Sequence, residues 1–222
     1  MIITGDTHGT LDLAKLKIYC TTHNTADEYI LILGDCGVRF HGGLKDSVTQ
    51  KALEDLPCKA ILFLDGNHEN FDLLNSYEVK EWNGGKVHFI SDKIIHLMRG
   101  QIFNIEDKTF FVFGGGNSID KEYRIEGRSW WPSEMPSKEE YEDGIRNLEE
   151  AGNKVDYILT HTAPDFICKQ LVNHLYEGEE ELQEYLGKIS SLVTFKEWYY
   201  GHWHFDKDIG SYKGMYNRVV EI

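Results

Sequence analysis

The amino-acid sequence predicts an α/β protein. Two continuous apolar runs, Tyr29–Leu33 and Ala60–Leu64, are typical of strands that are buried on both faces. Between them an apolar residue recurs every four positions from Leu44 to Leu56, which predicts a helix. Strands that alternate with helices favour parallel pairing, so these segments should form the parallel part of a sheet.

The first half of the chain contains further elements of both kinds. Residues 1–4 form a short apolar strand, and the apolar spacing over residues 11–20 predicts the helix that follows it. Farther along, short apolar runs separated by turn residues predict a meander of antiparallel strands. The expected strands of this meander are residues 87–90, 94–97, 101–105 and 109–113.

The second half begins with a polar and aromatic segment, residues 117–137, which we expect to be a long loop. Ser137 and Glu140 form a capping box, which predicts a helix that ends at Gly152. The remaining predicted elements are a strand over 156–159, a helix over 180–189, strands over 192–195 and 198–200, and a hairpin over 209–212 and 216–222. The sequence shows no internal repeat or low-complexity linker, so we expect one domain over residues 1–222.

Composition and charge limit the possible functions. Hydrophobic residues make up 41% of the 222 residues, which excludes a disordered chain. The net charge of -14 repels nucleic acid and anionic membranes, so extended nucleic acid is not an expected partner. No apolar run approaches the ~18 residues of a membrane span and no signal peptide is evident, so we expect a cytoplasmic protein. The four cysteines form no Cys-x-x-Cys pair and are expected to be free thiols: Cys20, Cys36, Cys58 and Cys168.

Five short polar clusters each follow an apolar, strand-like run. They supply carboxylate, amide and imidazole groups but no thiolate, which suits Mn, Fe, Zn or Co better than a structural cysteine–zinc site. Side chains at strand ends can converge from several strands on one place. The candidate metal ligands are Asp6, His8, Asp35, Asn67, His161, His202 and His204, enough for two divalent ions. A metal-dependent hydrolase is therefore the leading interpretation.

The charge of this ligand set favours an anionic substrate. Two divalent ions carry four positive charges, whereas Asp6 and Asp35 carry two negative ones and the other ligands are neutral. A bridging hydroxide would leave the cluster with a net positive charge. Such a site attracts an anion even within an acidic protein.

The five clusters resemble the motifs of the calcineurin-like metallophosphoesterases, and they occur in the order of that family. They are Asp6-x-His8, Gly34-Asp35, Gly66-Asn67-His68-Glu69, His161 and Gly201-His202-x-His204, which together span most of the chain. The resemblance implies an α/β fold of two stacked mixed β-sheets flanked by helices, in four layers of the order α/β/β/α.

The same resemblance implies roles for the ligands. One metal would be bound by Asp6, His8 and His204, and the other by Asn67, His161 and His202. Asp35 would bridge the two ions, of which manganese is the expected identity. A metal-bound hydroxide would attack a phosphate monoester or phosphodiester of a small molecule or nucleotide. His68 would not bind metal but would assist the leaving group, so Asp35 and His68 are the expected catalytic residues.

Two positions depart from the protein serine/threonine phosphatases of this superfamily. Arg39 keeps the place of a family arginine, but Val38 replaces the aspartate before it. Asp65 replaces an arginine that holds phosphate, and a carboxylate that pointed inward there would repel a phosphate dianion. Protein phosphatase activity is therefore less favoured than a small substrate. The sequence is also compatible with a nuclease and with a non-catalytic interaction module on the same fold.

The loop over residues 117–137 is expected to form a wall of the substrate pocket. Its arginines are either solvated charges or phosphate clamps, and Trp130 and Trp131 either pack or stack on a ring of the substrate. The preceding Gly114-Gly115-Gly116-Asn117 is either a plain turn or part of the site. The acidic run Glu177–Glu181 is expected to be a solvated helix start. The candidate substrate-binding residues are Arg39, Asn117, Arg124 and Arg128.

Overall fold

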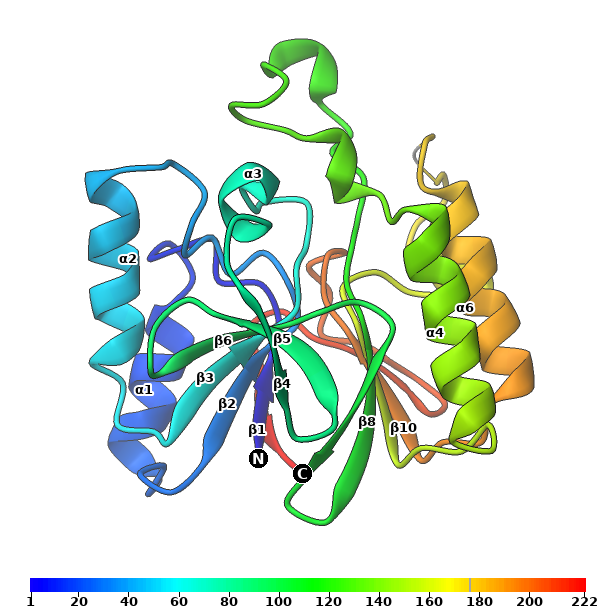
Figure 1. Cartoon of the computed structure of the whole chain (residues 1–222), viewed down its shortest axis with the longest axis horizontal. Helices are drawn as coiled ribbons and strands as arrows, with labels where there is room; N and C mark the ends of the chain where they lie inside the picture. The colour runs from blue at the N-terminus through cyan, green and yellow to red at the C-terminus, as the bar shows by residue number, and fades with distance from the viewer. Residues whose placement is uncertain (176) are drawn as a thin grey trace.

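Two mixed β-sheets stack face to face, and helices cover the outer face of each (Figure 1). The computed structural model describes residues 1–175 and 177–222 of the chain. The layers follow the order α/β/β/α, so the expected four-layer α/β fold is confirmed.

The first sheet contains seven strands in the order β13-β1-β2-β3-β6-β5-β4. Strands β1, β2, β3 and β6 are parallel to one another, whereas β13, β5 and β4 pair antiparallel with their neighbours. The bounds of the strands are β1 (Ile2–Thr4), β2 (Tyr29–Ile32), β3 (Ala60–Phe63), β4 (Val79–Trp82), β5 (Gly85–Phe89), β6 (Ile94–Leu97) and β13 (Val219–Glu221).

The second sheet contains six strands in the order β11-β12-β10-β9-β8-β7. Strands β8, β9, β10 and β12 are parallel, and β7 and β11 close the two edges in antiparallel pairing. The bounds are β7 (Gln101–Ile105), β8 (Lys108–Phe113), β9 (Tyr157–Thr160), β10 (Glu197–Tyr200), β11 (Asp208–Ile209) and β12 (Tyr212–Gly214).

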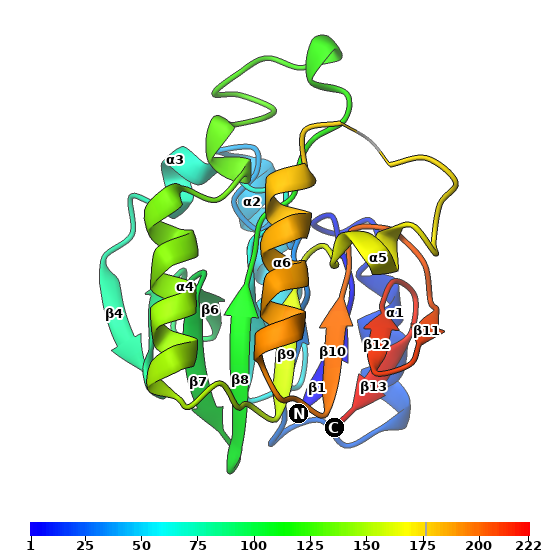
Figure 2. The same cartoon turned by 90° about the vertical axis from the view of Figure 1, so that its right-hand side faces the viewer.

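Two pairs of longer helices form the outer layers (Figures 1 and 2). Helices α1 (Ala14–Thr22) and α2 (Leu44–Glu54) cover the first sheet, and α4 (Lys138–Glu150) and α6 (Glu180–Leu192) cover the second. Shorter turns of helix are α3 (Phe71–Leu74), α5 (Asp165–Cys168), η1 (Lys121–Tyr123) and η2 (Pro132–Glu134). Within the described residues, no helix combines the length and the apolar character that crossing a membrane requires.

Strand β2 shows why the apolar runs are continuous. Leu31 and Leu33 belong to the core between the two sheets, whereas Ile30 and Ile32 pack beneath α1 and α2. Successive side chains of a strand point to opposite faces, so a strand buried on both sides requires apolar residues at every position. A third core lies between the second sheet and α4 and α6.

Three expectations about the elements were wrong. The predicted meander is divided between the sheets, because β6 pairs with β3 and β5 and the chain then crosses at residues 98–100 to begin β7. The final hairpin is β11–β12, and β13 instead pairs with β1 of the other sheet. Residue 192 ends helix α6, so no strand covers 192–195, and β4 was not predicted.

The parallel strands of both sheets end at the same edge of the molecule, which is uppermost in Figure 2. The loops that follow β1, β2 and β3 carry the first three polar clusters, and those that follow β9 and β10 carry the last two. The fold thereby brings together segments that are up to about 200 positions apart in the sequence.

Candidate metal centre

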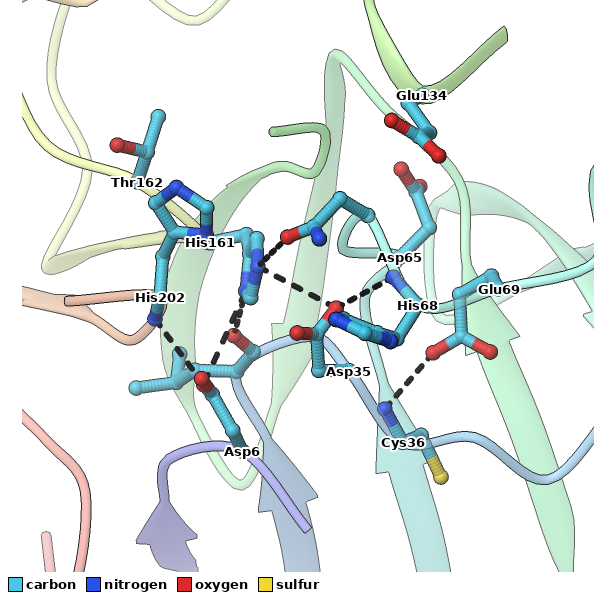
Figure 3. Close-up of polar contacts among 12 residues, drawn as sticks. Asp6, Asp35, Cys36, Asp65, His68, Glu69, Glu134, His161, Thr162 and His202 are labelled. Atoms are coloured by element: carbon cyan, nitrogen blue, oxygen red, sulfur yellow. Dashed lines mark hydrogen bonds and ion pairs between the residues drawn. The ribbon is translucent and has the colours of Figure 1, made fainter. Parts of the chain in front are cut away.

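Among the described residues, three groups of potential ligands lie at this edge, and they share members. Figure 3 shows Asp6, Asp35 and His161 of these groups. The ligand atoms within each group lie within 4.8 Å of one another. The groups are Asp6 with His8 and His204, His8 with Asp35 and His68, and Asp6 with Asp35 and His161. The shared members make one continuous cluster, in which Asp6, Asp35 and His161 are buried and the other histidines are partly buried or exposed.

The first group contains the three residues expected to bind the first metal. His204 Nε2 lies 3.0 Å from Asp6 Oδ2, and the rings of His8 and His204 are 5.1 Å apart between centroids. The second expected set lies on the other side of Asp6 and Asp35. There His161 Nε2 is 3.3 Å from Asn67 Oδ1, and the His161 and His202 rings are 4.8 Å apart.

Asp35 lies between these two sets. Its Oδ2 is 3.4 Å from His8 Nε2, and its Oδ1 is 3.4 Å from His161 Nε2. The backbone N–H of His68 donates to the same Oδ1 at 2.7 Å, which fixes the carboxylate plane. Each oxygen of Asp35 therefore faces a different histidine, as a bridging carboxylate requires.

Two histidine rings are oriented by hydrogen bonds on the nitrogen that faces away from the cluster. His161 Nδ1 lies 2.8 Å from the carbonyl oxygen of Leu33, and His8 Nδ1 lies 2.7 Å from Asp12 Oδ2. A proton on Nδ1 leaves the Nε2 lone pair of each ring directed at Asp35. Partners of this kind commonly set the tautomer of metal-binding histidines.

A third histidine ring, that of His202, is also oriented by a hydrogen-bonding partner. This partner is Glu179, whose role was not predicted from the sequence. Glu179 is buried, and its Oε1 lies 3.2 Å from His202 Nε2, which leaves Nδ1 as the nitrogen free for a metal. The same carboxylate accepts hydrogen bonds from the Asn117 N–H, Thr162 Oγ1 and Gln183 Nε2 at 2.7–3.0 Å. The acidic run is therefore not uniformly solvated, because Glu179 points into the protein.

Two of the motif glycines are required because a larger residue would not fit at their positions. A Cβ on Gly34 would lie 2.1 Å from His161 Nδ1, and one on Gly66 would lie 2.2 Å from Asp35 Oδ1. Any side chain at these positions would displace a ligand of a neighbouring motif. Four of the ligands themselves have left-handed backbone: His8, Asp35, His202 and His204, with φ between 44° and 64°. Such strained conformations in non-glycine residues concentrate at functional sites.

Glu69 of the third motif holds the second motif in place. Its Oε1 accepts from the backbone N–H of Cys36 at 2.8 Å (Figure 3). The same oxygen accepts from the backbone N–H of Gly37 at 3.3 Å. Burial, together with nearby Asp35, raises the pKa of this carboxyl well above its ordinary value. Glu69 therefore positions the loop that carries Asp35 rather than acting as a ligand.

The cluster is a region that favours positive charge. Burial would raise the pKa of Asp6, but the His204 and His161 rings lower it below its ordinary value. Burial would likewise lower the pKa of His202 and of His8, yet neighbouring carboxylates raise each to about 9. Glu179 is the main cause for His202, and Asp35 and Asp12 for His8.

The donor set fits divalent cations. Asp6 Oδ2 is buried and has no hydrogen-bond partner among the described residues, although His204 Nε2 is 3.0 Å away. A buried carboxylate oxygen that faces an imidazole without a well-aligned hydrogen bond would be stabilised further by a bound cation. Carboxylate, amide and imidazole groups without thiolate are typical ligands of Mn, Fe, Zn and Co.

A cavity of about 480 Å³ opens beside the cluster, and His8, Asp35, Asn67, His202 and His204 line it. His68 also lines this cavity, and Arg124 Nη2 lies 3.4 Å from His68 Nε2. Asp120 Oδ1 holds Arg124 Nε at 2.7 Å, so the guanidinium is fixed at the mouth of the site. Burial and the Arg124 charge lower the pKa of His68, although Asp35 opposes this.

The structure brings two of the four candidate substrate-binding residues to this cavity. Asn117 and Arg124 line it, although the Asn117 side chain is already hydrogen-bonded to Glu177 and Lys121. Arg39 is not at the cavity, because its guanidinium donates to Tyr77 Oη and Gln50 Oε1 at 2.8 and 2.7 Å. Arg128 is exposed and is not among the residues that line the cavity.

The two tryptophans of the 117–137 loop do not line the cavity either. Lys121 Nζ lies 4.7 Å from the Trp130 ring centroid. Trp131 is buried, and its Nε1 donates to Asp72 at 2.9 Å. Of the two roles considered for Trp131, the structure supports packing. Of the two arginines in this loop, Arg124 lies near the site and Arg128 does not.

Asp65 points away from the cluster. Its carboxylate is buried against Arg99, with Arg99 Nη2 2.6 Å from Oδ2, and His96 Nε2 lies 3.2 Å from Oδ1. Burial would raise the pKa of Asp65, but Arg99 and His96 hold it below its ordinary value. The carboxylate therefore does not face a phosphate, and the arginine nearest His68 comes instead from the 117–137 loop.

No protein-family model matches the chain, and no curated protein matches it. Two solved structures resemble it over 97% of its length. One is the phosphopantetheinyl hydrolase PptH from Mycobacterium tuberculosis, with 14% identity, a TM-score of 0.46 and 87% of that chain covered. The other is a candidate 5'-nucleotidase from Staphylococcus aureus in complex with alpha-ketoglutarate, with 15% identity and a TM-score of 0.48. The chain covers 47% of that second protein, and both similarities are distant.

Two mixed sheets stack between helical layers, and all five polar clusters meet at one edge of them. The fold and the converging motifs are those expected for the calcineurin-like metallophosphoesterases.

Proposed function

We propose that this chain is a calcineurin-like metallophosphoesterase that hydrolyses a phosphate monoester or phosphodiester of a small molecule or nucleotide. The observation that supports this most strongly is the position of Asp35, whose two oxygens face His8 on one side and His161 on the other. A carboxylate placed between two sets of donors is the arrangement that a pair of divalent ions requires.

Asp6, His8 and His204 would hold one ion and Asn67, His161 and His202 the other, with manganese as the proposed metal. Two ions bound there would supply an acidified water and positive charge for the phosphoryl oxygens. Ser118 supports this assignment for Asn67, since Asn67 Nδ2 donates to Ser118 Oγ at 3.2 Å. That bond leaves Asn67 Oδ1 directed at His161 and the cluster.

Arg124 and His68 would act on the substrate itself. Arg124 is fixed by Asp120 and extends to within 3.4 Å of His68, so a phosphate held at the cluster can also meet its guanidinium. His68 is half-buried beside Asp35 and is not needed in either ligand set. We propose that His68 donates the proton that the leaving oxygen gains as the P–O bond breaks.

The experiment is a metal-dependent hydrolysis assay with a matched pair of arginine variants. Protein stripped with chelator and then given Mn²⁺ should release phosphate from 4-nitrophenyl phosphate, or 4-nitrophenol from its phosphodiester analogue. Arg124→Ala should lower kcat/KM by about tenfold or more, since a charge-assisted contact is worth about 1.5–3 kcal/mol. Arg146→Ala serves as the control, because Arg146 is an exposed helix residue paired with Asp143.

Two outcomes would contradict the proposal. The first is no hydrolysis of monoesters or diesters by protein that binds metal, which would favour a non-catalytic interaction module. The second is equal loss in Arg124→Ala and Arg146→Ala, which would remove Arg124 from the substrate site.

A further inference from the structure

A second cavity, of about 590 Å³, adjoins the metal cluster and is not explained by metal binding. Its walls come from the loops after β1 and β2, the first two turns of α2, and His68 of the loop after β3. We call it the Phe40 cavity, because Phe40 lies next to His68 in its wall. The two rings are 5.6 Å apart between centroids, and the buried Trp131 supports Phe40 from 5.9 Å.

Most of the accessible surface of the Phe40 cavity is apolar, although histidine, threonine and lysine side chains also line it. Leu11 is 81% exposed and Val48 is 57% exposed, although both are large aliphatic residues. Exposed apolar side chains that gather around a concave surface usually mark a binding site for an apolar group. The volume suits a ligand portion of ring size or larger.

The charge of the cavity is unusual for this chain. The protein has 37 acidic residues against 23 basic ones, yet none of the described residues that line this cavity is Asp or Glu. Lys45, an exposed residue of α2, contributes a positive charge to the wall. The cavity therefore matches a group with an apolar body and a negative charge that can reach Lys45.

The position of His68 connects this cavity with the reaction. His8 and His68 line both the Phe40 cavity and the cavity that contains Asp35, Asn67 and Arg124. A phosphoryl group at the metal ligands and Arg124 would therefore have the leaving oxygen near His68. The rest of the leaving group would then extend past His68 toward Phe40.

We propose that the Phe40 cavity binds the leaving group of the substrate, and that this group has an apolar, ring-sized body with an anionic end near Lys45. The proposal rests on the proposed function. In the reaction, the oxygen of water forms a new bond to phosphorus and the P–O bond to the leaving group breaks. The leaving oxygen takes a proton, so the products are phosphate and an alcohol. The substrate class is thus a phosphate ester of an apolar alcohol that carries an acidic group.

Three monoesters that release primary alcohols test this preference: ethyl phosphate, 2-phenylethyl phosphate and 2-(4-carboxyphenyl)ethyl phosphate. The manganese-loaded wild-type protein should show a kcat/KM at least about tenfold higher for the phenylethyl ester than for the ethyl ester, because the ring is buried. The added carboxylate should raise kcat/KM by a further two- to fivefold or so, the range of an accessible ion pair.

Three variants of helix α2 make the test specific. Val48→Asp should lower the preference for phenylethyl over ethyl phosphate to about twofold or less. Lys45→Met, which keeps most of the aliphatic stem, should remove only the gain from the carboxylate. Leu44→Asp is the matched control, because Leu44 is 83% exposed on the same helix and does not line the cavity. Equal values for the ethyl and phenylethyl esters in the wild type, or equal effects of Val48→Asp and Leu44→Asp, would overturn the proposal.

A binding measurement separates this proposal from the proposed function. Propylphosphonate and 3-phenylpropylphosphonate replace the ester oxygen with carbon and cannot be hydrolysed at that position. Calorimetry should show the phenyl compound binding about tenfold more tightly to the wild type, and equal binding in Val48→Asp. Discrimination between the phosphonates without hydrolysis of any ester would support the cavity and contradict the activity. Hydrolysis without any discrimination would support the activity and contradict the cavity.

Discussion

Replacement of Glu179 should weaken one of the two metal sites and leave the other unchanged. The carboxylate holds His202 through Nε2 at 3.2 Å, and His202 is assigned to the ion that Asn67 and His161 also bind. Loss of a residue that orients a metal-binding histidine typically lowers metal affinity by about 10- to 100-fold. We therefore expect about tenfold for Glu179→Gln, which keeps the shape, and about 100-fold for Glu179→Ala.

A variant that removes a hydrogen bond to the second oxygen of Glu179 serves as a control for a general loss of folding stability. Gln183 Nε2 donates to Glu179 Oε2 at 2.7 Å, whereas His202 faces the other oxygen, Oε1. Gln183→Met removes that hydrogen bond at similar volume and should cost about 1 kcal/mol or more in the free energy of unfolding. The metal affinities should stay within about twofold of the wild type.

The assay is calorimetric titration of metal-stripped protein with Mn²⁺, together with denaturant unfolding of the same samples. The reasoning predicts two binding events in the wild type, only one of which weakens in the Glu179 variants. It would be refuted if both events weakened equally, or if neither changed by more than about twofold while unfolding showed the expected loss.

Three further predictions concern other residues. Asp35→Ala should abolish hydrolysis and weaken both metal sites, as metal analysis after dialysis would show, because each oxygen faces a different ligand set. His68→Ala should lower kcat on alkyl esters by about 10²–10⁴, with a smaller loss on aryl esters, while the metal content stays at the wild-type level. Burial and the neighbouring His96 lower the pKa of His88 from 6.5 to about 4. As the pH falls, His88 is therefore protonated in the unfolded chain before it is protonated in the folded protein. The contribution of neutral His88 to the free energy of unfolding is complete above about pH 6.5 and is lost as the pH decreases toward 4. His88→Gln should reduce that loss of stability, as denaturant unfolding at a series of pH values would show.

Each of these predictions has a clear contrary result. Two metals and normal turnover in Asp35→Ala would exclude a bridging role for that carboxylate. Equal losses on alkyl and aryl esters in His68→Ala would argue against proton transfer to the leaving group, and loss of metal would make His68 a ligand. An unchanged fall in stability in His88→Gln would assign the acid sensitivity to other groups.

The strands that carry the motifs could be predicted from the sequence because their burial leaves a direct signal. Strands β2 and β3 are covered on both faces, so nearly every residue in them is apolar. The polar clusters stand out against those runs. Parallel strands end at one edge of a sheet, so the strand order predicts that the clusters after β1, β2 and β3 converge. The clusters after β9 and β10 belong to the other sheet, and only the family resemblance implied that they meet the first three.

Other features depend on contacts between distant segments and leave little local signal. Glu179 lies in an acidic run whose neighbours Glu177 and Glu180 are exposed, and only its contact with His202 distinguishes it. Only residues 98–100 connect β6 and β7, a length that also suits a hairpin, so the change of sheet is visible only in the strand pairing. Arg39 stands at a family position, but Tyr77 and Gln50 hold it elsewhere.

Anomalous scattering from crystals grown with Mn²⁺ tests the central claim most directly. We predict two manganese peaks about 3.5–4 Å apart, one on each side of the Asp35 carboxylate. One peak should lie beside Asp6, His8 and His204, and the other beside Asn67, His161 and His202. A single peak, or peaks bound only by exposed acidic residues away from this cluster, would contradict the claim that the chain holds a two-metal centre.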